Sequence, residues 1–190
     1  MKRTLTVLVS TISIWVASAS HATLIVGTAS LDASQEVPAG ISTSTATGVA
    51  TVIADTAAST VSITLAVTGI SLPDITFPGG GLAFDAAGPV HVHNAPAGAN
   101  GVIILPFPNM VDYAATATGF ELTSTVLLSA MAFDTFVAAM TSDSTYINVH
   151  TLAVGSGEIR GQIAVPAPGT LGLLALGVLG LALKRRKLTI

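Results

Sequence analysis

Alternating apolar and polar residues dominate the middle of the chain and predict β-strands. The clearest alternation runs from Val61 to Val67, where the odd positions are Val, Ile or Leu and the even positions are Ser, Thr or Ala. The segment 48–55 alternates in the same way, and the short link between the two predicts a hairpin. Further strands are expected at 23–31, 89–94, 101–106, 145–152 and 158–164.

Short strands separated by Gly, Pro and Asn indicate a mainly β fold, a single antiparallel β-sandwich or barrel. Only the segment 126–140 departs from this period. It is rich in Ala, Leu and Met and predicts one short helix packed over the end of the sheet. The stretches 70–88 and 107–125 carry Pro, Gly and Asp and are expected to be long loops.

The N-terminal segment has the three parts of a secretory signal peptide. Lys2 and Arg3 precede an apolar run from Leu5 to Val16, and small residues follow as far as Ala22. We therefore expect signal peptidase to remove residues 1–22, or to cut after Ala19. The alternative is an uncleaved membrane helix, which needs about 20 apolar residues, more than this run provides.

The C-terminal segment, residues 165–190, reads as a membrane anchor. The uncharged stretch from Val165 to Leu183 is followed by four consecutive basic residues. As a helix this stretch spans roughly 28 Å, close to the bilayer core of about 30 Å. Positive charge stays on the cytoplasmic side, so a transmembrane helix here places the preceding domain outside.

The same segment resembles the PEP-CTERM sorting signal of bacteria that export proteins alongside exopolysaccharide. The family usually has Glu where this chain has Ala167. The resemblance implies that an exosortase-type enzyme removes a transient inner-membrane anchor and releases the protein to the cell surface or beyond, where extracellular polysaccharide is a partner. A permanent single-span anchor is the alternative. The positions that carry the resemblance are Val165, Pro166, Pro168, Arg185, Arg186 and Lys187.

Charge and cysteine content narrow the function of the central part, residues 23–164. This part holds all ten acidic residues and one basic residue, Arg160, a formal charge of −9. Nucleic acid is therefore not expected as a partner, because phosphate binding needs clustered Lys and Arg. The chain has no cysteine, which excludes disulfides, thiolate catalysis and Cys-ligated zinc. About 140 residues form one domain.

Three histidines form a candidate metal or ligand site for copper or zinc. His91 and His93 are two residues apart on a predicted strand, so both imidazoles leave the same face. His150 lies on a later strand and offers a third nitrogen, which would complete a usable set of ligands.

A structural interpretation of the surrounding polar residues stays open beside the metal site. In it they form a hydrogen-bonded network that fixes strand register, with Arg160 paired to an acid such as Glu158 or Glu36, because a buried unpaired guanidinium is costly. The residues of this candidate network are Glu36, Asn148, Glu158, Arg160 and Gln162.

Four short segments occur in a fixed order along these regions: SQEVP at 34–38, HVH at 91–93, YINVHT at 146–151 and GEIRGQ at 157–162. Together they resemble the CHRD domain, a family named from chordin and widespread in exported bacterial proteins. The resemblance covers nearly all of residues 24–164. It implies an extracellular β domain, usually without an assigned enzymatic activity.

Three hypotheses about function follow. The first is a non-enzymatic binding domain at the cell surface or in the extracellular matrix. The second is an extracellular protein that binds copper or zinc through His91, His93 and His150. The third, a Ser-His-Asp hydrolase, is the weakest, because the chain lacks a Gly-x-Ser-x-Gly elbow.

Overall fold

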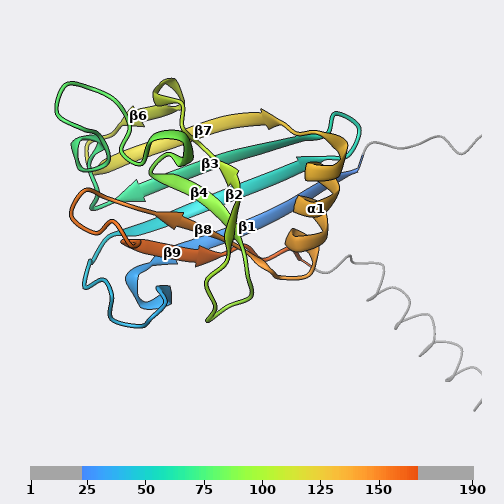
Figure 1. Cartoon of the computed structure of the whole chain (residues 1–190), viewed down its shortest axis with the longest axis horizontal. Helices are drawn as coiled ribbons and strands as arrows, with labels where there is room; N and C mark the ends of the chain where they lie inside the picture. The colour runs from blue at the N-terminus through green and yellow to red at the C-terminus, as the bar shows by residue number, and fades with distance from the viewer. Residues whose placement is uncertain (1–22, 167–190) are drawn as a thin grey trace, which may run out of the picture.

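The structure is a computed structural model that describes residues 23–166. The predicted signal peptide and nearly all of the predicted membrane anchor lie outside the described residues. Within the described part, the chain is mainly β, as the alternation predicts, with nine strands and one α-helix (Figure 1).

All nine strands belong to one antiparallel sheet, in the order β5-β4-β8-β9-β1-β2-β3-β7-β6. The sheet curls, so that β4 lies in front of β2 and β3 in Figure 1. The strands are β1 (Leu24–Asp32), β2 (Thr47–Asp55), β3 (Thr60–Thr68), β4 (Val90–Asn94), β5 (Val102–Pro106), β6 (Tyr113–Ala115), β7 (Gly119–Leu127), β8 (Thr145–Val149) and β9 (Ile159–Gln162).

The predicted sandwich or barrel is thus replaced by a half-barrel made from one curled sheet. Strand β9 explains the difference, because it pairs with β8 on one side and with β1 on the other. The Thr28–Ala164 bridge, with two backbone hydrogen bonds of 3.0 and 2.9 Å, extends the contact with β1. The two halves therefore join edge to edge instead of stacking as separate sheets.

The concave side of the sheet holds the hydrophobic core. The hairpin of β2 and β3, predicted from the sequence, supplies pairs such as Val52–Ile63 and Ala50–Leu65, and all four side chains are buried. On the opposite wall, Val90, Val92 and their neighbours on β8 point into the same core. Because side chains alternate along a strand, this burial turns the polar residues of β4, β8 and β9 to the other face.

The segment 107–125 is not the loop that we expected, because it contains β6 and most of β7. Along β7 the buried positions are Phe120, Leu122 and Ser124, and the hydroxyl in the third position hides the apolar period. Ser124 is accommodated because its hydroxyl donates to the Asp112 carboxylate at 2.7 Å. A hydrogen-bonded polar residue thus replaces an apolar one inside a regular strand.

The single helix, α1 (Ala130–Thr141), begins later than the predicted start at residue 126, since β7 continues to Leu127. Ser129 caps it by accepting a hydrogen bond from the Ala132 amide at 3.4 Å. The helix lies at the end of the sheet, as predicted, and buries Phe133, Phe136 and Met140 (Figure 1). The strands predicted at 145–152 and 158–164 are shorter in the structure.

Candidate metal centre

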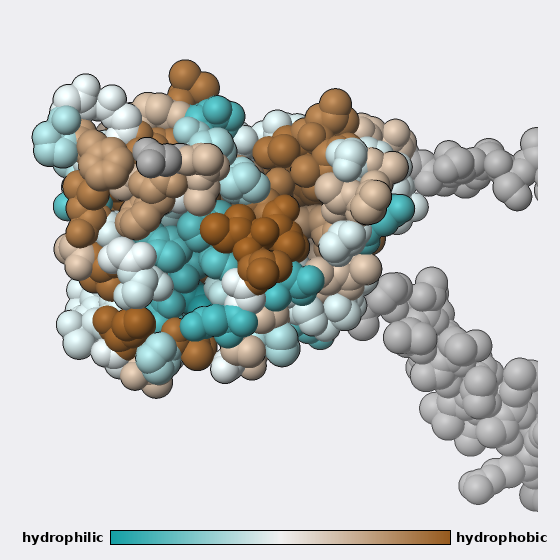
Figure 2. Space-filling view, in the orientation of Figure 1, coloured by the Kyte–Doolittle hydropathy of each residue, from teal (hydrophilic) through white to brown (hydrophobic). Residues whose placement is uncertain are grey.

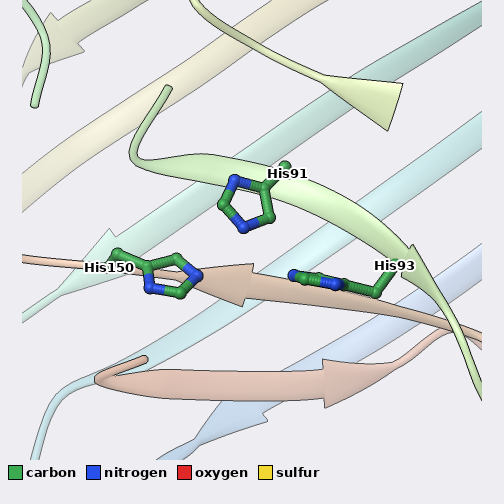
Figure 3. Close-up of side chains that lie close together, drawn as sticks. All are labelled: His91, His93 and His150. Atoms are coloured by element: carbon green, nitrogen blue, oxygen red, sulfur yellow. The ribbon is translucent and has the colours of Figure 1, made fainter. Parts of the chain in front are cut away.

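The three histidines converge on one space over the outer face of the sheet. His91 and His93 are on β4, and His150 directly follows β8, with its amide donating to the Pro89 carbonyl at 2.8 Å. Strands β4 and β8 pair with His91 opposite Asn148 and His93 opposite Tyr146. Figure 3 shows the three rings turned toward one another. The predicted grouping of these residues is present in the structure.

The separation of the ring nitrogens suits one metal ion after a small adjustment. One ligand atom from each histidine lies within 4.8 Å of the other two. Zinc–nitrogen bonds of about 2.0–2.1 Å require nitrogens about 3.3–3.6 Å apart in tetrahedral or trigonal geometry. A movement of each ligand nitrogen by up to about one ångström closes this difference.

Each imidazole is held by a hydrogen bond from Nδ1 to a backbone carbonyl. The acceptors are the carbonyls of Gly88 for His91, Gly101 for His93 and Gly155 for His150, at 3.1, 2.8 and 3.0 Å. A carbonyl only accepts, so Nδ1 carries the proton and Nε2 keeps its lone pair. This is the arrangement by which proteins orient histidine ligands around a metal.

The Nε2 atoms of His93 and His150 are buried and have no hydrogen-bond partner in the described structure. Leaving a buried acceptor without a donor costs roughly 1–3 kcal/mol. Two such atoms beside each other, both with lone pairs available, fit the demands of a bound cation. The chemistry of the donor set also fits, because neutral imidazole is a good ligand for both copper and zinc.

The electrostatic setting keeps all three imidazoles neutral near pH 7. Burial lowers the pKa of His91 to about 4, with smaller contributions from His150 and His93. Burial also lowers the pKa values of His93 and His150. Because only the neutral ring binds a metal, the site is ready to coordinate without first losing a proton.

A stack of three side chains connects the histidines to the neighbouring strand β9. The ring of His93 lies parallel to Tyr146, with centroids 4.7 Å apart and planes at 2°. The guanidinium carbon of Arg160 lies 3.4 Å from the centre of the same tyrosine ring. Tyr146 therefore holds the orientation of His93 through packing, and Arg160 adds a cation–π contact to it. Tyr146 was not among the predicted site residues.

Arg160 is 1% exposed and makes its hydrogen bonds to the loop that follows β4. Its guanidinium donates to the Asn100 side-chain oxygen at 3.1 Å and to the carbonyls of Ala99 and Pro96 at 2.8 and 3.4 Å. The same loop ends at Gly101, whose carbonyl accepts from His93. Arg160 therefore supports His93 from two directions, through the loop and through Tyr146.

Glu158 and Glu36, the two carboxylates predicted as partners of Arg160, have different neighbours. Glu158 accepts hydrogen bonds from Ser44 at 2.7 Å and Thr151 at 2.5 Å. Glu36 is 3% exposed. Burial lowers the pKa of Arg160, and the charges of Tyr146 and Glu36 oppose this shift, so Glu36 and Arg160 interact electrostatically. A side chain at Gly157 would press on the Glu36 carboxylate, with 2.7 Å between an added Cβ and Oε1.

Burial raises the pKa of Glu36 to about 7, although Arg160 and hydrogen bonding from Asn148 oppose the shift. The folded state thus binds this proton more tightly than the unfolded state, and ionisation removes stability as the pH rises from about 4.5 to about 7. As the pH rises from about 4 to about 8, the free energy of unfolding of Glu36→Gln should increase by on the order of 3 kcal/mol relative to that of the wild type. Urea unfolding of both proteins at the two pH values measures this; a constant difference would contradict it.

Two comparisons with known protein families identify the parts of the chain. The model of the CHRD domain matches residues 27–163, well over half of the chain. The chain belongs to the CHRD domain family. No curated protein and no solved structure matches it significantly. All three histidines, Glu36 and the stack on Tyr146 lie inside the CHRD domain.

The second match is the PEP-CTERM protein-sorting motif, over residues 164–187. This motif implies export, membrane-associated sorting and processing by exosortase-type machinery. Its first residue, Ala164, is bonded to Thr28 in the sheet, and Val165 packs against the core. The first residues of the motif are therefore part of the folded unit, directly after the end of the CHRD match. Between residues 23 and 166 we found no helix of the length and apolar character that a bilayer crossing requires.

Proposed function

We propose that this CHRD domain is an exported metal-binding domain that holds one copper or zinc ion through Nε2 of His91, His93 and His150. The observation that carries the proposal is the pair of buried, unpartnered Nε2 atoms on His93 and His150, each on a ring whose Nδ1 donates to a backbone carbonyl. His91 completes the set within 4.8 Å.

The proposed role is binding, without a catalytic step of its own. A bound copper or zinc ion supplies a positive charge and an open coordination position. The chain orients the three rings, excludes water from their Nε2 atoms and keeps them neutral. Residues 23–164 carry a formal charge of −9, so the domain as a whole attracts cations.

Export to the cell surface or the extracellular matrix completes the proposal. In it, signal peptidase removes residues 1–22, and the C-terminal segment anchors the protein in the inner membrane until an exosortase-type enzyme acts on it. The match to the sorting motif supports the C-terminal part of this proposal, which is membrane-associated sorting and processing by an exosortase-type enzyme. Cell fractionation, with the mass of the mature protein measured, tests it; a cytosolic protein with both ends intact would overturn it.

We expect this site to keep its metal at acidic pH values at which a site made of ordinary histidines has already released its metal. Protons compete for Nε2, and the lowered pKa values of the three rings weaken that competition. We expect the ring resonances of His91 in metal-free protein to titrate near pH 4, compared with 6.5 for an ordinary histidine. NMR titration measures this; a midpoint near 6.5 would show that the site is solvated.

A further inference from the structure

A second cavity, with both apolar and polar residues in its lining, lies on the same face as the three histidines, between the loops that follow β1 and β4. It has a volume of about 360 Å³, at the lower end of the range for small-molecule sites. Glu36, Arg160 and Gln162 line its interior. Figure 2 shows hydrophilic residues gathered in the middle of this face. Small exposed residues border the cavity: Ser34, Ala39, Ala97 and Gly98.

Two residues that line this cavity each carry a buried side-chain oxygen atom that has no hydrogen-bond donor in the described part of the protein. The two atoms are Oε1 of Glu36 and Oε1 of Gln162. The orientation of the Gln162 amide is fixed, because its Nε2 donates to the carbonyls of Ala95 and Asp143 at 3.1 and 2.9 Å. The other end of the amide therefore presents an acceptor, and the ligand that fits here donates at least two hydrogen bonds.

The cavity also presents hydrogen-bond donors. A guanidinium has five N–H groups, and among the described residues Arg160 directs three hydrogen bonds to the loop of Pro96, Ala99 and Asn100. The two remaining N–H groups of Arg160 can pair with an acceptor on a ligand, whereas the Ser34 hydroxyl already donates to the Asp32 carboxylate at 2.5 Å. A group that fits this setting must donate and accept together.

The charges of Arg160 and Glu36 determine which chemical groups of a ligand fit this cavity. The positive charge of Arg160 opposes an ammonium group, which in addition accepts no hydrogen bond. The carboxylate of Glu36 opposes an anion. A hydroxyl group is neutral and both donates and accepts, so it matches the acceptors of Glu36 and Gln162 and the donors of Arg160 at once.

We propose that this cavity binds one ring of a carbohydrate through its hydroxyl groups. Two hydroxyls donate to Glu36 and Gln162, and one of them accepts from Arg160. The small residues at the rim leave room for sugar units on either side of the bound ring. This proposal is independent of the metal centre, since none of the three histidines lines the cavity.

The test uses the full chain in a detergent without a sugar headgroup. Glucose, galactose and N-acetylglucosamine are the probes, with permethylated glucose as a sugar that accepts but cannot donate, and methylamine as a cation. Saturation-transfer NMR detects contact and calorimetry gives the affinity. We expect saturable binding of at least one free sugar and none of permethylated glucose or methylamine.

At about pH 8.5, where Glu36 is ionised, the variant Glu36→Gln should weaken sugar binding at least about tenfold, because a neutral amide oxygen accepts a weaker hydrogen bond than a carboxylate. Unfolding does not explain such a loss, because this substitution is expected to stabilise the protein near neutral pH. The matched control is Glu121→Gln, a change at an exposed carboxylate on β7, which should bind as the wild type does. Absence of binding by all three free sugars, equal binding by the Glu36 variant, or preference for methylamine would each overturn the proposal.

Discussion

A double variant with His91→Ala and His93→Ala is expected to contain no stoichiometric copper or zinc. Two of the three ligands that share about 10 kcal/mol or more of binding free energy are removed, so the affinity should fall at least about a thousandfold. Metal content by mass spectrometry and competition with a chromogenic chelator measure the loss. The wild type should hold close to one ion per chain.

The control for this experiment is Glu121→Gln, far from the histidines in the sheet order, which should keep its metal. Circular dichroism and urea unfolding of the double variant show whether the fold is intact. A wild-type protein that takes up no copper or zinc would reject the metal site. Equal metal in the double variant would place the ion elsewhere.

Substitution of Arg160 by Lys should both destabilise the protein and weaken metal binding. Lysine keeps the charge but cannot reproduce the guanidinium contacts to Asn100, Ala99 and Pro96, and it loses the planar contact with Tyr146. We expect a loss of about 2–4 kcal/mol in the free energy of unfolding, because these groups are buried. Urea unfolding measures this loss.

The metal affinity of the Arg160→Lys variant shows whether Arg160 positions His93 or only stabilises the fold. With the loop loosened, the Gly101 carbonyl no longer fixes Nδ1 of His93, so the affinity should fall under conditions where the variant is fully folded. The control Glu158→Gln alters a nearby charge that bonds to Ser44 and Thr151, and should leave the metal affinity unchanged. An Arg160→Lys protein with wild-type affinity would show that the arginine only supports the fold.

The sequence predicts the strands that carry the site because their alternation is regular. H-x-H on β4 places both imidazoles on one face, and the polar positions of β8 and β9 fall beside them once those strands pair. β7 escaped prediction because Ser124 occupies a buried position, and its hydrogen bond to Asp112 comes from a residue twelve positions away. The alternation of apolar residues indicates which positions are buried, but it does not show that a buried polar side chain has a hydrogen-bond partner elsewhere in the chain.

The hydrogen-bond partners of Arg160 could not be predicted from the sequence for a similar reason. Sequence reasoning looks for a carboxylate, whereas two of the three acceptors that the structure shows are backbone carbonyls of Pro96 and Ala99. Every residue has the same backbone carbonyl whatever its side chain, so no residue type marks these positions. The cavity beside Glu36 is equally hidden, because it arises where two loops distant in the chain meet.

The main-chain acceptors around the three imidazoles have a consequence for evolution. The carbonyls of residues 88, 101 and 155 orient the rings, and two of these positions leave no room for a side chain. A Cβ added at Gly88 would lie 2.3 Å from the Phe107 carbonyl oxygen, and one added at Gly101 would lie 1.9 Å from the Asn94 carbonyl oxygen. Homologues that keep the same histidine cluster should therefore keep glycine at these two positions, while the exposed loop residues between them are free to vary.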